Sequence, residues 1–341
     1  MDGDAEVMQD LEIREPTRSD LPLVRALYRS VKGRVRPERY DEWRFFDTPW
    51  GDSPALVALK DGACMALYLT WPAALSIGGE TVLGVQIMDV MTHPDLRRRG
   101  LFVHLAHGAN AIAMERGFEI GYGFPNEVSL PLFVRFINGD HAGDVSSWSA
   151  DFRARGRWWE RRRTWPEPGL RGTELDPTRP EPDELETLVA ELHADPEICW
   201  VAKTAAYLDW RYSDASGERY DWLSLRTPAG ELLAVGLVGE RDEAWGGDFA
   251  GVARMHELFA RTEEQAEVLL RFAAARAARR GALKVQILVK DPVVAAVLPR
   301  AGLRPEGSVP FLVRKFTGRL LAGNVHHFPF WRIISGDMDF Y

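Results

Sequence analysis

The sequence predicts an α/β fold built on a mixed sheet and present in two tandem copies. The chain has 341 residues, which corresponds to two domains at about 150 residues per domain. The N-terminal half contains helical and extended patterns in alternation, with antiparallel strands between the helices. The motif Tyr40–Phe45 (YDEWRF) returns as Tyr207–Tyr212 (YLDWRY), which indicates an internal repeat.

The elements of the N-terminal half follow from local patterns. We expect a short strand and a turn over residues 11–18, and then a helix over about residues 20–30, whose apolar residues recur at helical spacing. Residues 55–94 have the pattern of several strands separated by Asp-Gly and Gly-Gly turns. A long helical run over residues 96–117 ends at a glycine, and a strand and a shorter helix follow over residues 118–126 and 129–137.

Residues 166–183 are rich in proline, glycine and charge, which is typical of a linker. They separate a first domain, residues 1–165, from a second, residues 184–318, and a C-terminal tail follows over residues 319–341. The two domains share an order of elements. Residues 111–124 and 273–287 each contain an alanine-rich helix, an Arg-Gly stop and an apolar strand, and residues 126–139 correspond loosely to residues 291–304.

Composition excludes several classes of protein. Hydrophobic residues make up 46% of the chain and charged residues 27%, which is a core-forming composition rather than a disordered one. No apolar stretch reaches about 18 residues, and the acidic N-terminus lacks the apolar region of a secretory signal. Two cysteines cannot form a disulfide framework or a four-cysteine zinc site. We therefore expect a cytoplasmic globular protein with no membrane span and no metal.

The charge balance argues against a general nucleic-acid-binding protein, because the net charge is −8 and the pI is near 5.6. One segment, Arg153–Arg163 (RARGRWWERRR), is strongly basic and contains two tryptophans. Such interleaving could bind single-stranded nucleic acid, but the alternation of arginines favours a strand with one solvated face.

The most informative segment runs from Val90 to Phe102 (VMTHPDLRRRGLF). An apolar strand ends at His-Pro, a basic loop follows, and Gly100 begins the long helix. The free N–H groups and positive dipole end of a helix start suit a phosphate, and neighbouring arginines add charge-assisted hydrogen bonds. The spacing matches neither a dinucleotide-binding glycine motif nor a P-loop. Its simplest alternative is a solvated, arginine-rich helix start.

This segment resembles the pyrophosphate loop of the GNAT N-acetyltransferases, which has the form R/Q-x-x-G-x-G/A. HPDLRRRGLF (residues 93–102), GFPNEVS (residues 123–129) and GDMDF (residues 336–340) together resemble bacterial two-domain GNAT proteins. The resemblance implies two tandem GNAT-like domains, the second degenerate, with a docked C-terminal tail. It also implies acetyl-CoA as the co-substrate.

The resemblance implies a role for each matching position. The strand end would hold the pantetheine arm, the loop and helix start would hold the pyrophosphate, and an asparagine and a serine after the next strand would lie near the thiol end of the coenzyme. The strand end is Val90, Met91 and Thr92. The loop and helix start are Arg97, Arg98, Arg99, Gly100, Leu101, Phe102 and Val103, and the asparagine and serine are Asn126 and Ser129. A simpler role for Asn126 is that of an N-cap, and both roles are compatible.

Two positions depart from the family pattern. Phe133 stands where many GNAT enzymes have a tyrosine that protonates the leaving thiolate, so the thiolate leaves unaided or another group, such as Tyr122 or Tyr341, supplies the proton. Phe102 replaces a small residue that normally packs against the coenzyme, unless its side chain points into the core.

The acceptor amine must be uncharged to attack, so a general base is expected. Asp89 is the one ionised residue in an apolar strand, and a lone buried carboxylate is costly unless it is paired or used. It is therefore a candidate base. The alternatives are a structural partner for Arg44 or another buried cation, or a solvated position at a sheet edge. The aromatic tail ending at Tyr341 offers a second candidate, because it is expected to dock between the halves or to complete a sheet.

The second half lacks the phosphate-binding loop. Residues 260–267 (ARTEEQAE) contain no glycine and three carboxylates, which would repel a pyrophosphate. We expect one working site and a small amine acceptor, such as an amino sugar or an amino-acid derivative, with no nucleic acid or membrane as partner. The alternatives are a non-catalytic acyl-CoA-binding sensory module and an aminoacyl-tRNA-dependent peptidyl transferase, which also pairs two GNAT-like domains.

Overall fold

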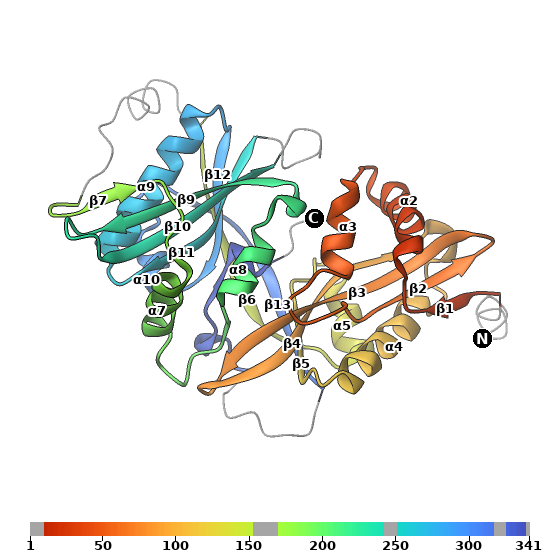
Figure 1. Cartoon of the computed structure of the whole chain (residues 1–341). Helices are drawn as coiled ribbons and strands as arrows, with labels where there is room; N and C mark the ends of the chain where they lie inside the picture. The colour runs from red at the N-terminus through yellow and green to blue at the C-terminus, as the bar shows by residue number, and fades with distance from the viewer. Residues whose placement is uncertain (1–9, 153–169, 242–250, 317–324, 339–341) are drawn as a thin grey trace.

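The computed structural model describes residues 10–152, 170–241, 251–316 and 325–338 (Figure 1). One continuous mixed sheet runs through both halves, in the order β1-β2-β3-β4-β5-β13-β6-β12-β11-β10-β9-β7. Its strands are β1 (Glu12–Arg14), β2 (Ala55–Lys60), β3 (Ala63–Ile77), β4 (Glu80–Thr92), β5 (Ile120–Gly123), β6 (Asp140–Asp151), β7 (Glu174–Asp176), β9 (Glu218–Arg226), β10 (Leu232–Arg241), β11 (Val252–Ala260), β12 (Lys284–Lys290) and β13 (Arg304–Lys315). Two short strands, β8 (Trp200–Val201) and β14 (Ile333–Ile334), pair with β3 and β12.

The helices of the N-terminal half cover both faces of the sheet. α2 (Leu21–Lys32) and α3 (Glu38–Phe45) lie on one face, and α4 (Leu101–Glu115) and α5 (Leu130–Ile137) lie on the other (Figure 1). The apolar stripe expected on α2 is buried against the sheet. The two expected turns join β2 to β3 and β3 to β4 through glycines in the left-handed region. The long helix begins at Leu101, later than the expected residue 96, and ends at Glu115, two residues before the glycine that was expected to stop it.

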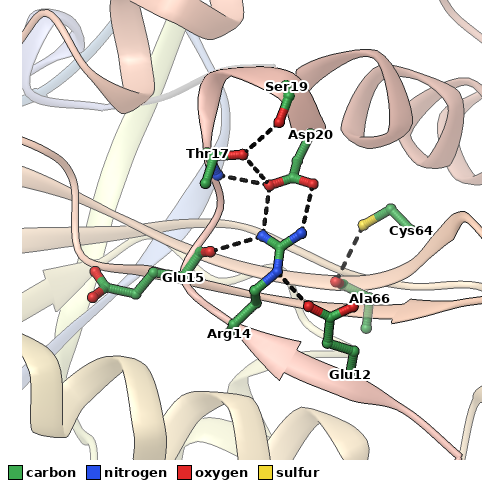
Figure 2. A network of polar contacts seen from close by, with 8 residues as sticks. All are labelled: Glu12, Arg14, Glu15, Thr17, Ser19, Asp20, Cys64 and Ala66. Carbon is green, nitrogen blue, oxygen red and sulfur yellow. Dashed lines mark hydrogen bonds and ion pairs between the residues drawn. The ribbon is translucent and has the colours of Figure 1, made fainter.

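A polar network fixes β1 to the start of α2 (Figure 2). Two guanidinium nitrogens of Arg14 donate to the two carboxylate oxygens of Asp20, at 2.6 and 2.9 Å. The backbone N–H and the hydroxyl of Thr17 donate to the same carboxylate. The hydrogen bond from Arg14 is the main reason that the pKa of Asp20 is lowered, so this carboxylate stays ionised at ordinary pH.

The C-terminal half repeats the arrangement. α9 (Glu263–Arg279) and α10 (Pro292–Val297) pack on one face of β9–β12, while α7 (Pro182–Leu192) and α8 (Ala205–Arg211) belong to the core on the other face. The repeat found in the sequence matches elements of the structure: α9 and β12 correspond to α4 and β5, and the YLDWRY motif forms α8 where YDEWRF forms α3. α3 is a helix that the sequence patterns did not predict.

The two halves exchange a strand. β13, from the end of the second half, lies antiparallel between β5 and β6 of the first half. β6, from the end of the first half, pairs in turn with β12 of the second half. Each half therefore completes its sheet with the last strand of the other, and the sheet has no internal edge between the halves.

The repeated motif lies at the centre of the molecule. Trp43 of α3 donates its indole N–H to the carbonyl of Trp210 at 2.7 Å, and Trp210 of α8 donates to the carbonyl of Trp43 at 3.2 Å. The two rings lie 5.1 Å apart between their centroids. Equivalent residues of the two repeats thus contact each other reciprocally, as they do around a two-fold axis.

Three expectations need correction or lie outside the described residues. The expected linker, residues 166–183, contains strand β7, which pairs with β9, and α7 begins within it at Pro182. The basic segment Arg153–Arg163 and the terminal Tyr341 lie outside the described residues. Within the part of the chain that the structure describes, no helix is long and apolar enough to span a membrane.

Candidate active site

A bulge in β4 opens the sheet beside β5. β4 and β5 pair in parallel from Gly84 and Ile120 to Ile87 and Gly123, and their pairing stops there. On its other side β4 pairs with β3, where the register shifts so that two residues, Asp89 and Val90, face one residue of β3. Beyond this point β4 is free on the side of β5, and its backbone can pair with an extended ligand.

A cleft of about 830 Å³ lies at this opening. Its walls come from the free end of β4, the loop and start of α4, the segment after β5, and α5. Almost all residues predicted to hold the coenzyme line it: Val90, Met91, Thr92, Arg97, Arg98, Gly100, Leu101, Phe102, Val103, Asn126 and Ser129. Arg99 is exposed and is not among the lining residues.

The start of α4 has the geometry of an anion site. Gly100 is the N-cap of α4 and has a φ of +76°, in the left-handed region. The N–H of His104 donates to the carbonyl of Gly100, so the three preceding N–H groups lack a partner in the helix. Arg98 has a φ of +66°, and the Nε of Arg97 donates to the carbonyl of Thr92. The loop therefore presents N–H groups and two guanidinium groups at one end of the cleft.

The segment after β5 forms a capped turn. The side-chain oxygen of Asn126 accepts hydrogen bonds from the N–H groups of Val128 and Ser129, at 3.1 and 2.8 Å, and from the Ser129 hydroxyl at 2.9 Å. Asn126 thus caps this turn, and it also lines the cleft, so both roles considered for it fit the geometry.

Phe102 and Phe133 form an aromatic pair at the cleft. Their rings lie edge to face, with centroids 5.3 Å apart, and Phe102 also contacts the ring of Tyr68. Phe102 points partly into the core on the α4 side of the sheet, which accounts for its bulk. Among the described residues that line the cleft there is no histidine, tyrosine or cysteine. Tyr122 is buried on the opposite face, and burial raises its pKa well above the usual value.

Asp89 has the structural role that the sequence left as its alternative. Its carboxylate forms ion pairs with Arg36 and, at 2.8 Å, with Arg44, and its side chain is only 3% exposed. Burial opposes ionisation, but the two guanidinium groups outweigh it and lower the pKa of Asp89. A carboxylate with a lowered pKa and two charged partners is a poor proton acceptor, so this geometry does not favour the role of general base.

Several lining residues were not found from the sequence. Lys32, at the end of α2, lines the cleft from the far side of the sheet, and Leu312 comes from β13 of the second half. Val128, Leu132 and Phe136 form an apolar stripe along one lip, each at least 40% exposed. The four-residue spacing of this stripe, which begins in the turn before α5 and continues along α5, was the available signal. Leu312, in contrast, reaches the cleft only through the strand exchange.

The second half has the same opening, but the pocket that remains there is small, about 90 Å³. β11 and β12 pair only from Val252 to Arg254, and β11 has its own bulge, at His256. The C-terminal segment fills the gap: β14 pairs with β12, and the N–H of Leu288 donates to the hydroxyl of Ser335 at 2.8 Å. The tail is therefore docked, and it occupies the place that corresponds to the cleft of the first half.

Comparisons with known proteins agree with this architecture. Residues 12–136 match the family model described as "Acetyltransferase (GNAT) domain". None of the curated proteins compared with this sequence matches it.

Three solved structures share the fold over most of their length. A tandem GNAT protein from the clavulanic acid biosynthesis pathway is 15% identical, with a TM-score of 0.63 over 91% of this chain and 100% of its own. A GCN5-related N-acetyltransferase from Sphaerobacter thermophilus is 16% identical, with a TM-score of 0.59 over 92% and 99%. N-myristoyltransferase from Saccharomyces cerevisiae, with bound myristoyl-CoA, is 12% identical, with a TM-score of 0.67 over 89% and 80%.

The family match covers β4, the basic loop, α4 and nearly all of α5, which are the elements that build the cleft. Over these elements the chain is similar to a GNAT acetyltransferase domain, and the solved structures share its fold.

Proposed function

We propose that this chain transfers the acetyl group of acetyl-CoA to the primary amine of a small molecule, such as an amino sugar or an amino-acid derivative. The observation that carries the proposal is the cleft in which a strand end freed by the β4 bulge meets the glycine-led start of α4. An extended arm and an anionic group, the two parts of coenzyme A, fit these two features.

Each part of the cleft has a role in binding. The N–H groups at the start of α4 and the guanidinium groups of Arg97 and Arg98 hold the pyrophosphate. The backbone of Val90, Met91 and Thr92 pairs with the pantetheine arm. Asn126 and Ser129 border the cleft on the side of α5. The carbonyl oxygen of the thioester then lies at the β4 bulge, where backbone N–H groups stabilise the charge that develops on it.

The acceptor nitrogen attacks the thioester carbonyl directly. The new C–N bond forms, the C–S bond breaks, and the thiolate of coenzyme A leaves. Phe133 cannot protonate this thiolate, so it leaves as the anion. The amine gives up its proton to a base. Tyr341 remains the candidate base that the sequence suggested, and it lies outside the described residues.

Calorimetric titration with acetyl-CoA and with desulfo-CoA tests the coenzyme site. We expect one site per chain for both ligands, because the corresponding opening of the second half is filled by the tail. Two sites would contradict the single-site proposal, and no binding of either ligand would overturn the proposed function.

A panel of acceptors then tests the substrate class. We expect acetyl-CoA turnover with amino sugars or amino-acid derivatives, and none with lysine-containing peptides or an aminoacyl-tRNA. Turnover with peptides alone would contradict the small-amine assignment. A chain ending at Met338 tests the candidate base: unchanged turnover in a folded chain would exclude Tyr341 from the reaction.

A further inference from the structure

The β4 bulge is held in an unfavourable backbone conformation. Asp89 has a φ of +45°, in the left-handed region that residues other than glycine rarely adopt. Asparagine and aspartate tolerate this region best, yet the surrounding structure must still stabilise it. Asp89 lines the cleft although its side chain is almost fully buried, so its backbone faces the cleft while its carboxylate faces away.

Two buried arginines hold this carboxylate. Arg36 precedes α3 and Arg44 lies within it, and neither side chain is exposed to solvent. Arg36 lies over the ring of Tyr28 and also pairs with Asp41, whereas Arg44 donates a second hydrogen bond to the sulfur of Met88. These additional contacts therefore hold both guanidinium groups in place beside Asp89.

We propose that Arg36 and Arg44 are positioning residues, which hold Asp89 in its left-handed conformation and so aim the backbone of the β4 bulge at the thioester carbonyl. This inference rests on the proposed function. Asp89 then contributes through its backbone, and its carboxylate serves as the anchor of the bulge. The arrangement links the α2–α3 side of the sheet to the reaction, although neither arginine lines the cleft.

The second half contains a similar ion pair at its bulge, but neither His256 nor Glu257 is in the left-handed region. Lys203 lies four residues before Tyr207, as Arg36 lies four residues before Tyr40. Its ammonium donates at 2.8 Å to Glu257, which adjoins the β11 bulge. There the tail fills the opening, and its Asp337 pairs with the same lysine. In both repeats a cation that precedes α3 or α8 thus pairs with an acid at the bulge. Asp89 lines the large cleft, whereas Glu257 lines neither that cleft nor the small pocket beside the tail. Glu257 is therefore a matched control for Asp89.

Steady-state kinetics of Asp89→Asn and Asp89→Gly test the proposal. Asparagine and glycine both tolerate the left-handed region, so backbone strain is not increased, and both variants lose the charged anchor. We expect kcat to fall by about 10- to 100-fold, less than for the loss of a whole oxyanion donor, because the N–H groups are displaced rather than removed. Affinity for desulfo-CoA, which lacks the thioester, should stay within about 3-fold of the original.

Further variants separate positioning from other roles. Arg44→Lys keeps a cation beside Asp89 and should retain more activity than Arg44→Met. The pH dependence of the remaining activity should keep its shape in Asp89→Asn, whereas loss of a general base would remove one limb of the profile. Glu257→Gln should leave kcat unchanged, and so should Asp61→Asn, which alters another left-handed aspartate in an exposed turn.

The outcomes distinguish the two proposals. Unchanged kcat in Asp89→Asn and Asp89→Gly, in a chain that turns over, overturns the positioning role and leaves the function intact. If no acceptor supports turnover, the ratio of affinities for acetyl-CoA and desulfo-CoA replaces kcat. If the affinity for acetyl-CoA falls relative to that for desulfo-CoA in the Asp89 variants but not in Glu257→Gln, the result supports the positioning role. An unchanged ratio of the two affinities overturns that role. Absence of coenzyme binding in the unaltered protein overturns both proposals.

Discussion

Gly100 is the residue on which the proposed coenzyme binding depends most directly. Its φ of +76° is costly for any other residue, by about 1–2 kcal/mol, and its position at the start of α4 faces the expected pyrophosphate. Gly100→Asp would add a negative charge to this anion site. We expect acetyl-CoA affinity to fall at least 10-fold in calorimetric titration, while the fold remains intact by circular dichroism.

Gly117 provides the control, because it lies just beyond the other end of the same helix with a φ of +85° and has open space around it. Gly117→Asp should carry a similar backbone cost without a change in affinity. Equal affinity in Gly100→Asp and the unaltered chain would show that the pyrophosphate binds elsewhere.

At the scale of single residues, the sequence predicted the parts of the site that are contiguous in the chain. The loop from Arg97 to Val103 and the Asn126 turn are local patterns with a local physical meaning. The partners of Asp89 were harder to identify, because an ion pair joins residues 45 or more positions apart. Its burial in an apolar strand predicted a cation, and Arg44 was named, but Arg36 was recognisable only by its spacing before the repeated Tyr40 and Tyr207 motif.

At the scale of elements, the junction of β1 and α2 depends on an ionised carboxylate. The pKa of Asp20 is lowered in the folded chain, so its stabilising contribution is complete above the unfolded pKa, near 4, and is lost as the pH falls through the folded value. Asp20→Asn should lower the free energy of unfolding at pH 7 by about 1–3 kcal/mol. The difference between the two proteins should shrink below about pH 4 in urea titrations.

Glu12 is the matched control, because it also accepts a hydrogen bond from Arg14 but is largely exposed (Figure 2). Glu12→Gln should cost less than about 0.5 kcal/mol at pH 7. A loss as large as that of Asp20→Asn would mean that Arg14, rather than the buried carboxylate, determines the stability of the junction.

The contact between α3 and α8 joins the repeats. Each tryptophan both donates to and accepts from its counterpart, so loss of one ring removes packing and leaves a buried carbonyl without its donor. Trp210→Ala should lower the free energy of unfolding by about 3–5 kcal/mol, measured with denaturant. Trp210→Phe keeps most of the volume and should cost about 1–3 kcal/mol. A cost below 1 kcal/mol for the alanine variant would show that this contact does not join the halves.

Helices with one apolar face were predictable, and α3 was not. α2 has a clear stripe, whereas α3 buries Asp41 and Arg44 together with Tyr40 and Trp43, so its polar and apolar residues show no helical period. An element that is buried around most of its surface, and whose buried charges pair with residues of other segments, leaves no amphipathic signal. Only the repeat of its motif indicated that it was an ordered element.

At the scale of the whole molecule, the sequence predicted two copies of one fold but not the exchange of β6 and β13. Strand order depends on pairing between residues more than 100 positions apart, for example Gly123 with Leu312, and no local pattern encodes that choice. The exchange means that neither half can complete its own sheet. It also brings Leu312 of the second half into the cleft of the first.

The docked tail fills the opening between β11 and β12 in the second half, and it can pack there because residue 336 is a glycine. A Cβ at this position would overlap the hydroxyl of Tyr212 and the carboxylate of Glu257. Gly336→Ala should therefore lower the free energy of unfolding by about 1–3 kcal/mol, whereas Ser335→Ala, which only removes the hydrogen bonds to Leu288, should cost about 1 kcal/mol.

Acetyl-CoA stoichiometry in Gly336→Ala then separates two reasons why we expect the second half not to bind the coenzyme. The start of α9 has no glycine and carries Glu263 and Glu264 in its first turn, so a phosphate would be repelled even with the tail displaced. We expect calorimetry to show one site per chain in this variant, as in the unaltered protein. A second site would mean that the tail alone closes the second cleft, and that the acidic helix start does not prevent coenzyme binding.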